Sequence, residues 1–468
     1  MPDSVVVAGL APHPPIIIPE IGRGEEKQAI STIRAMEELG KAFSQSGLDT
    51  LVIITPHGPV FSDAISLAAL PELEGDFGQF GARMVGATLK IDLALVNAIT
   101  ERNSGTGIQV VELNRRRYSW YGIRPRLDHG VLVPLYYLRK HGFDAPLVII
   151  NIGFLPYLEL YRFGKTVAEA ASELGRKIGV LASGDLSHRL KPDAPAGYNE
   201  RGKVFDELLM SKLKSFSVED ILCMPGELIA DAGECGLRPV TIMLGSLDEA
   251  LVEPEVLSYE GPWGVGYGIA LFRPVGKGES RVSDIVRQKQ AAMALKRRQE
   301  SFPVSLARTA VEHYVKTGKP FAVEADVPAR FTQRAGVFVS IRKEGDLRGC
   351  IGTTESTTGS IVDEIIQNAV SAATDDPRFS PVTADELDVL EYSVDILSPP
   401  EPVDSVAELE PSKYGVICVK GNKKGLLLPD LPGVNSAREQ LSIAKRKAGI
   451  DPHDTQVKVY RFTVERFK

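Results

Sequence analysis

The sequence predicts an α/β protein: an N-terminal three-layer domain with a mainly parallel sheet, followed by a smaller α+β domain. Three observations predict this arrangement. Short β-rich apolar runs alternate with longer amphipathic stretches over residues 1–274, the order that places helices on both faces of a parallel sheet. The apolar runs are continuous rather than alternating, as in strands buried on both sides. At 468 residues the chain is also too long for one hydrophobic core.

The elements expected in the first domain alternate in type along the chain. The strands are predicted at Val5–Leu10, Leu51–Thr55, Ala64–Ala68, Leu147–Ile152, Gly179–Ser183 and Gly266–Phe272. The helices are predicted at Glu25–Ser46, Leu93–Arg102, Gly130–Lys140, Tyr157–Leu174 and Tyr198–Leu213. The following stretch, 275–302, is charged, Gln-rich and poor in large apolar residues, which is typical of a partly helical linker. We therefore expect domains at 1–274 and 303–468.

In the second domain strands follow strands, which favours an α+β arrangement. Helices are predicted at Ser305–Lys316, Gly359–Ala373 and Ser436–Ala448. Strands are predicted at Gly336–Arg342, Leu347–Thr353, Leu387–Leu397, Val416–Val419, Gly425–Leu428 and Gln456–Thr463. The polar segment Lys-Gly-Asn-Lys-Lys at 420–424 is a hairpin turn signal between two of these strands.

The composition argues against several classes of function. Charged residues make up 25% and hydrophobic residues 43% of the chain, the balance of a soluble globular protein. A net charge of −7 gives no global reason to expect nucleic acid or an anionic membrane as partner. No apolar run reaches the ~18–20 residues of a transmembrane helix, and the N-terminus lacks the basic start of a signal peptide. The four cysteines do not suggest a disulfide framework, so we expect a cytoplasmic protein.

Three histidines follow predicted strands. His13 lies in Ala-Pro-His-Pro-Pro, His57 in Thr-Pro-His-Gly-Pro, and His188 in Gly-Asp-Leu-Ser-His. Ligands of an open parallel sheet bind at the carboxyl ends of its strands, so these side chains should converge on one edge. Imidazole is the commonest side-chain metal ligand near neutral pH. A loop histidine without chemistry is the simpler interpretation for any one of them, but three at equivalent positions favour a shared metal site.

Further candidates lie in two other loops. His129 follows Asp128 just before a predicted helix, where it would contact a substrate or merely accompany the helix cap. Glu234 and Cys235 stand together in Ala-Gly-Glu-Cys-Gly. A carboxylate would complete a metal-binding facial triad, and a thiolate is a softer alternative ligand. The chain has no Cys-x-x-Cys and no His-Glu-x-x-His, so the spacing does not indicate a zinc motif.

The second domain contains one candidate nucleophile, Cys350, in Leu-Arg-Gly-Cys-Ile-Gly at 347–352. A thiolate beside the cationic Arg348 would suit nucleophilic chemistry. The alternative, which we slightly favour, is a small buried residue in a strand, with glycines that permit close packing.

The histidine motifs and the Gly-Glu-Cys-Gly segment of the N-terminal domain resemble those of a known family. Residues 1–273 are similar to the LigB-type catalytic subunit of class III extradiol ring-cleavage dioxygenases. The resemblance implies that Fe(II) is held by His13, His57 and Glu234 and that His188 is the acid/base. It implies contact of His129 with substrate or dioxygen. The substrate would then be a small catechol-like aromatic compound, cleaved with dioxygen.

The related Memo proteins differ from the dioxygenases at the third ligand. They place a cysteine before the glycine near this position, which matches Cys235 here. A thiolate ligand would put ring-cleavage chemistry in doubt. The resemblance therefore leaves two hypotheses open, in which Glu234 favours a dioxygenase and Cys235 favours a metal-binding protein without that activity.

Residues 303–468 resemble the AMME-syndrome chromosomal-region (AMMECR) family, whose hallmark is the Leu-Arg-Gly-Cys-Ile-Gly segment. Chains that pair this domain with a Memo/LigB-like domain resemble components of the AmmeMemoRadiSam system. That resemblance implies a radical S-adenosylmethionine protein as partner in a modification pathway. It assigns no reaction to the second domain, and a homo-oligomer is a further hypothesis.

Overall fold

A computed structural model describes residues 4–323, 327–343, 345–431, 434 and 436–468. The chain divides into two compact units, unit 1 over Met1–Lys289 and unit 2 over Gln290–Lys468. Among the described residues, no helix combines the length and the apolar character needed to cross a membrane.

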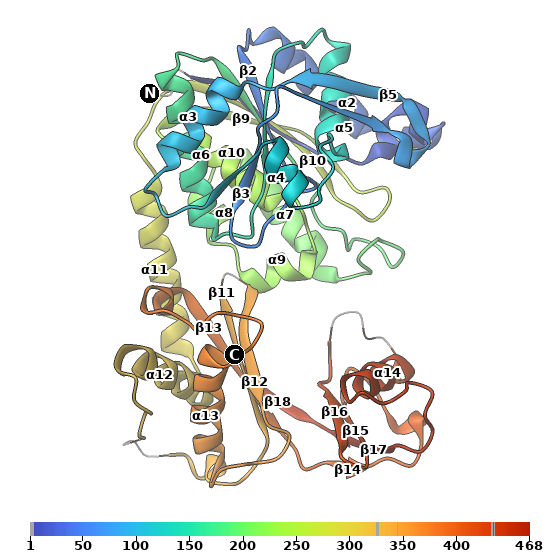
Figure 1. The fold of residues 1–468 in the computed structure, drawn as a ribbon, viewed down its shortest axis with the longest axis vertical. Coiled ribbons are helices and arrows are strands. Elements are labelled where there is room, and N and C mark those ends of the chain that lie inside the picture. Colours follow the sequence, from blue (N-terminus) through green and yellow to red (C-terminus); the bar gives the residue numbers. More distant parts are fainter. Residues whose placement is uncertain (1–3, 324–326, 344, 432–433, 435) are drawn as a thin grey trace. The chain divides into compact units, whose positions relative to one another are not determined.

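Unit 1 is built on an eight-stranded sheet with the strand order β6-β3-β7-β2-β8-β1-β10-β9 (Figure 1). The strands are β1 (Val5–Ala11), β2 (Thr50–Thr55), β3 (Ile65–Ala68), β6 (Val110–Leu113), β7 (Leu147–Asn151), β8 (Ile178–Ser183), β9 (Ala250–Glu260) and β10 (Tyr267–Lys277). The central strands β7, β2, β8 and β1 run parallel. They are almost wholly buried, as continuous apolar runs predict. The α/β fold class is confirmed.

Helices cover both faces of this sheet. On one side lie α2 (Ile30–Gln45) and α5 (His129–Lys140), and on the other lie α3 (Leu93–Asn103), α6 (Tyr157–Glu173) and α10 (Leu237–Ser246) (Figure 1). The remaining helices of unit 1 are α1 (Pro19–Gly22), α4 (Arg115–Trp120), α7 (Glu200–Lys214), α8 (Val218–Leu222) and α9 (Gly226–Ala232). One large hydrophobic core fills the space between the layers.

Two glycines let α6 and α10 approach backbone to backbone. A Cβ at Gly164 would lie 1.9 Å from the carbonyl oxygen of Ile242, and one at Gly245 would lie 1.9 Å from that of Tyr161. Both contacts are with backbone carbonyl oxygens, which cannot move aside as the end of a flexible side chain can. Because α10 begins just after Cys235, this contact also fixes the loop that carries the candidate ligand.

We expect Gly245→Ala to destabilise unit 1 by about 1–3 kcal/mol, since it overpacks a helix contact that cannot expand. Both tryptophans, Trp120 and Trp263, lie in unit 1, so denaturant unfolding followed by tryptophan fluorescence reports on this unit alone. Gly276→Ala is the matched control, because its Cβ would meet nothing closer than a Leu251 side-chain atom at 3.4 Å. Equal midpoints for the two variants would contradict the packing argument.

Unit 2 contains two four-stranded antiparallel sheets, ordered β12-β11-β13-β18 and β14-β17-β15-β16. Its strands are β11 (Val337–Lys343), β12 (Asp346–Gly352), β13 (Leu390–Leu397), β14 (Glu401–Pro402), β15 (Gly415–Lys420), β16 (Lys423–Leu427), β17 (Lys458–Phe462) and β18 (Val464–Phe467). Its helices are α12 (Phe302–Thr317), α13 (Ile361–Thr374) and α14 (Ala437–Lys447). The predicted hairpin turn at 420–424 joins β15 to β16.

Several elements of unit 1 differ from the expectation. A separate hairpin, β4 (Glu72–Phe77) and β5 (Ala82–Lys90), was not predicted, because its polar, Gly-containing sequence lacks an apolar run. The strand β9 was not predicted either, since Glu253 and Glu255 interrupt its apolar residues and Pro254 lies between them. Within the expected linker, α11 forms one helix over Val282–Gln299 and passes the boundary between the units.

Candidate metal centre

The three strand-following histidines come from neighbouring strands. In the order β2-β8-β1 the strands run parallel, so their carboxyl ends share one edge of the sheet. His57 follows β2, His188 follows β8 and His13 follows β1. The sheet topology thus brings residues far apart in sequence to one place, the edge at which open α/β sheets bind ligands.

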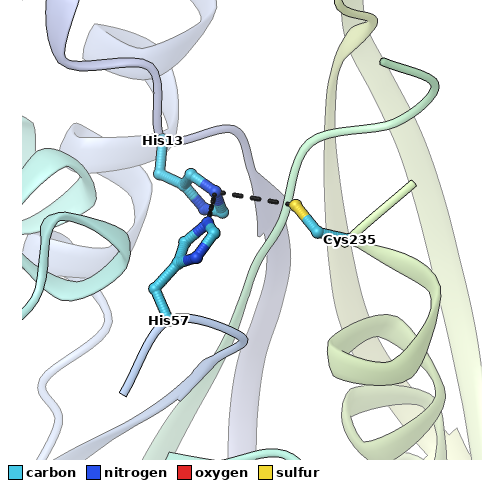
Figure 2. A group of neighbouring side chains, drawn as sticks. All are labelled: His13, His57 and Cys235. Atoms are coloured by element: carbon cyan, nitrogen blue, oxygen red, sulfur yellow. Dashed lines mark hydrogen bonds between the residues drawn. The ribbon is translucent and has the colours of Figure 1, made fainter. Parts of the chain in front are cut away.

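Two of these histidines form a compact group with Cys235 (Figure 2). The Nε2 atoms of His13 and His57 lie 2.8 Å apart, and the Sγ atom of Cys235 lies 3.7 Å from His13 Nε2. All three ligand atoms lie within 4.8 Å of one another. Two donors held about 2.0–2.3 Å from one ion would stand roughly 3.0–3.7 Å apart. The donor set and its spacing therefore fit a single metal ion.

The hydrogen bonds behind His13 fix which ring nitrogen carries the proton. The Ser183 hydroxyl donates its only hydrogen to the carbonyl oxygen of Gly130 at 2.5 Å. Its oxygen lies 2.9 Å from His13 Nδ1 and must therefore accept a hydrogen bond from the N–H at that nitrogen. In the neutral ring, His13 Nε2 then presents a lone pair to His57 and Cys235, as a metal ligand must.

His188 is held in the same tautomer by a different partner. Its Nδ1 lies 2.7 Å from the carbonyl oxygen of Gly233, which can only accept. Nε2 of the neutral ring is therefore unprotonated and able to take a proton. Desolvation by burial lowers the pKa of His188, although the bond to Gly233 acts against it, so the ring is mainly neutral at pH 7.

His129 completes the cluster of imidazoles. Its ring stacks on that of His57 at a centroid distance of 4.3 Å and meets the ring of His13 edge-on at 5.3 Å. Asp128 caps α5 by accepting the Val131 N–H, and it also accepts the Thr55 hydroxyl at 2.8 Å. The cap predicted from the sequence thus ties the start of α5 to the end of β2.

The surroundings keep these rings uncharged. Burial, followed by the neighbouring charge of His57, lowers the pKa of His13 well below its usual value. Desolvation and then the charge of His129 lower the pKa of His57 to about 4. Desolvation also lowers the pKa of His129. Neutral imidazoles are the form that binds metals.

Glu234 and Cys235 point to different partners. The carboxylate of Glu234 accepts the Leu237 N–H at 2.6 Å, at the first turn of α10, where the helix dipole favours negative charge. Among the described residues it does not join the group of ligand atoms, whereas Cys235 does. Burial raises the pKa of Glu234 to about 7 and that of the Cys235 thiol well above its usual value. A bound metal ion would reverse the second effect, because coordination deprotonates thiols.

Asp185, a buried carboxylate in the Gly-Asp-Leu-Ser-His segment, is a further residue of the site that the sequence pattern did not single out. Its Oδ1 accepts the backbone N–H of His13 at 2.9 Å, and its Oδ2 lies 3.9 Å from His13 Nε2. Its own N–H donates to Cys235 Sγ at 3.3 Å. Burial raises the pKa of Asp185 to about 7. The signal for this residue was its place directly after β8, the same signal that indicated His188.

Cys350 belongs to unit 2 and lies on β12, at the edge of its sheet. Its half-buried thiol accepts the Ser340 hydroxyl at 3.2 Å, and its N–H donates to Asp376 at 2.8 Å. Arg348, predicted to act on this thiol, instead donates two hydrogen bonds to the Glu386 carboxylate at 3.0 and 2.9 Å. A different cation lies beside Cys350, since the Arg378 guanidinium donates to its carbonyl oxygen at 3.3 Å. The nucleophile and the packing interpretations of Cys350 both stay predictions.

The comparisons with known proteins cover both units. Residues 8–270 match the family model described as the catalytic LigB subunit of aromatic ring-opening dioxygenase, and residues 304–467 match the AMMECR1 model. Protein CA_C1420 of Clostridium acetobutylicum is 42% identical over 463 residues, which cover 98% of this chain and 97% of that protein.

Two further relatives match about a third of the chain. A Thermotoga maritima protein is 54% identical over 167 residues, 35% of this chain and 96% of that protein. The crystal structure of uncharacterized protein PH0010 from Pyrococcus horikoshii is 37% identical, covers 35% of this chain and 88% of its own, and aligns with a TM-score of 0.34. Because the LigB model spans more than half of the sequence, the chain belongs to the family of the metal-dependent catalytic LigB subunit of aromatic ring-opening dioxygenases, and it carries an AMMECR1 domain in addition.

Proposed function

We propose that unit 1 is an Fe(II)-dependent oxidoreductase that opens the ring of a catechol-like aromatic compound with dioxygen. The proposal is supported by the match of residues 8–270 to the catalytic LigB subunit, together with the convergence of His13, His57 and His129 at one sheet edge. When bound, the ion would orient the reactants and stabilise developing oxyanion charge.

The protein's own groups supply the proton chemistry. His188 Nε2 is unprotonated in the tautomer fixed by Gly233, so it can accept a hydroxyl proton from the substrate and later return it. His129 lies against His57 and meets the Phe80 ring edge-on at 5.6 Å. Flat rings of this kind suit contact with an aromatic substrate.

A second candidate function has one observation in its favour. The group of ligand atoms contains Cys235, while Glu234 caps α10. A thiolate in place of the carboxylate favours a metal-binding protein without ring cleavage, working with a radical S-adenosylmethionine protein in a modification pathway. The two candidates share the metal site and differ in the chemistry performed there.

Anaerobic Fe(II) binding, followed by a panel of catechols and air, separates these candidates. The comparison uses the wild type, Cys235→Ala and Glu234→Ala. We expect about one equivalent of iron in the wild type and a ring-opened, yellow product from one or more catechols. Iron bound without turnover of any catechol would support the second candidate. Absence of iron binding by the wild type would remove the metal site from both.

A further inference from the structure

Residues 114–126, which we call the arginine segment, contain α4 (Figure 1) and form the connection from β6 to α5 except for its last two residues, Leu127 and Asp128. Five of its residues are arginines and none is acidic, although the whole chain has a net charge of −7. The arginines are Arg115, Arg116, Arg117, Arg124 and Arg126. Positive charge is therefore concentrated in one short surface stretch.

Carboxylates do not compensate this charge. All of these arginines except Arg117 are exposed. Among the described residues, none of the five has a carboxylate within ion-pair distance. Their guanidinium contacts go to backbone carbonyls, from Arg117 to Glu112 at 3.1 Å and from Arg126 to Asp76 at 3.4 Å.

Some exposed arginines elsewhere in unit 1 find carboxylates, whereas others, such as Arg34 and Arg83, have none within ion-pair distance among the described residues. Arg273 lies 2.7 Å from Glu255, and Arg102 lies 2.7 Å from Glu169. What distinguishes the arginine segment is that five arginines without an ion pair to any described residue lie within 13 residues of sequence. Its guanidinium groups are free to meet anions from outside the molecule, and phosphate suits their planar fork.

The same segment exposes two aromatic rings. Trp120 is 77% exposed and Tyr121 is 46% exposed. The two rings are nearly parallel, at an interplanar angle of 12° and a centroid distance of 6.2 Å. The ring of Phe61 contacts the Tyr121 ring in an edge-on arrangement, at a centroid distance of 5.1 Å. Large rings left in water beside unpaired arginines form a surface on which further flat groups can stack.

An open groove of about 630 Å³ adjoins the start of α4. Arg115 and Lys90 supply cationic groups to its lining, Glu72 supplies one carboxylate, and Leu70 and Ile91 are among its apolar residues. A groove lined by both cationic and apolar residues suits an extended chain that carries both phosphates and flat bases.

We propose that the arginine segment binds single-stranded nucleic acid. Phosphates would pair with the guanidinium groups, and bases would stack on Trp120 and Tyr121. A small anion or an acidic peptide would use the charges but would leave the aromatic rings exposed. The overall charge of −7 argues against nucleic acid only on average, because distant charges are screened beyond roughly 8–10 Å at physiological salt.

The test is fluorescence anisotropy of a fluorescein-labelled twelve-nucleotide oligothymidylate titrated with the full chain at several salt concentrations. We expect binding that weakens with salt. Combined Arg115→Gln and Arg116→Gln should weaken binding about tenfold or more and reduce the salt slope by about 1.4, the value for two lost phosphate contacts. Trp120→Ala should weaken binding about tenfold through lost stacking and leave the slope unchanged.

The matched control removes the same charge elsewhere. Arg34 on α2 and Arg298 on α11 are both exposed, and the combined Arg34→Gln and Arg298→Gln variant should bind like the wild type. Loss of binding in this control, or no binding by the wild type at low salt, would overturn the proposal. So would full affinity in Trp120→Ala, equal competition by polyglutamate, or binding to phosphatidylglycerol vesicles in place of the oligonucleotide.

Discussion

Replacement of His13 by alanine should reduce metal affinity by more than about 100-fold, the largest effect expected in unit 1. His13 lies nearest the centre of the group, with its Nε2 atom 2.8 Å from that of His57 and 3.7 Å from the Cys235 sulfur. The variant loses one of the three ligands, and it is the ligand that contacts both of the others. The measurement is isothermal titration of the metal-free wild type and variant with Fe(II) under anaerobic conditions.

Ser183→Ala should give a graded effect at the same site. The serine holds the Nδ1–H tautomer of His13 because its oxygen accepts the hydrogen bond from Nδ1–H while its hydroxyl donates to the Gly130 carbonyl oxygen. Loss of such an outer partner typically costs about 10–100-fold in metal affinity. His141→Ala is the control, because that ring binds Glu37 at 2.8 Å on the surface. If Ser183→Ala and His141→Ala bind metal equally well, the tautomer argument is wrong.

The second large effect is expected in unit 2, where Glu364→Gln should destabilise the fold by about 3 kcal/mol or more. The Glu364 side chain is fully buried and accepts hydrogen bonds from the loop that follows β12. The donors include the hydroxyls of Thr353, Thr357 and Thr358 at 2.6, 3.0 and 2.7 Å, and the N–H groups of the latter two. The glutamine side chain would place its NH2 group opposite some of these hydrogen-bond donors. Each buried donor left without an acceptor costs about 1–3 kcal/mol.

Thermal unfolding followed by circular dichroism checks this prediction, with tryptophan fluorescence reporting unit 1 separately. A loss of about 3 kcal/mol should lower the midpoint of unit 2 by roughly 6–12 °C. Glu355→Gln is the control, since that exposed carboxylate pairs with Lys424 on the surface. An unchanged midpoint for Glu364→Gln would show that the loop does not depend on this carboxylate.

Glu364 also predicts how the stability of unit 2 depends on pH. Burial alone would raise its pKa, but the hydrogen bonds from Thr353, Thr358 and Thr357 outweigh burial and hold the pKa at about 2. A carboxyl with a folded-state pKa below its unfolded value of about 4.3 stabilises the fold above that value. Its contribution should therefore be lost as the pH falls from about 4 towards 2. In Glu364→Gln this part of the acid dependence should disappear.

The sequence predicted the fold where local pattern and tertiary environment agree. The runs that became β1, β2, β7 and β8 are apolar throughout because both of their faces are covered. The hairpin β4–β5 lies apart from the main sheet, and its strands alternate between buried and exposed positions with Gly and charged residues between them. Such a segment carries no apolar run that could indicate a strand.

The candidate site was partly predictable for the same reason. The positions of His13, His57 and His188 follow from strand ends, and the topology made those strands neighbours. The choice between Glu234 and Cys235 could not be made, because adjacent residues in a loop face different ways and only the start of α10 decides which one caps the helix. The pairing of Arg348 with Glu386 likewise depends on residues 38 positions apart.

The most direct test of the account is whether the Cys235 sulfur binds the metal. Co(II) added anaerobically to the full chain reports on this, because a thiolate ligand gives an intense charge-transfer band in the near ultraviolet that nitrogen and oxygen ligands do not give. We predict this band at one equivalent of Co(II), its loss in Cys235→Ser, and its retention in Glu234→Gln. A stoichiometric Co(II) complex without the band would contradict sulfur ligation. A complex abolished by Glu234→Gln and intact in Cys235→Ser would contradict it as well and would assign the third ligand to the Glu234 carboxylate.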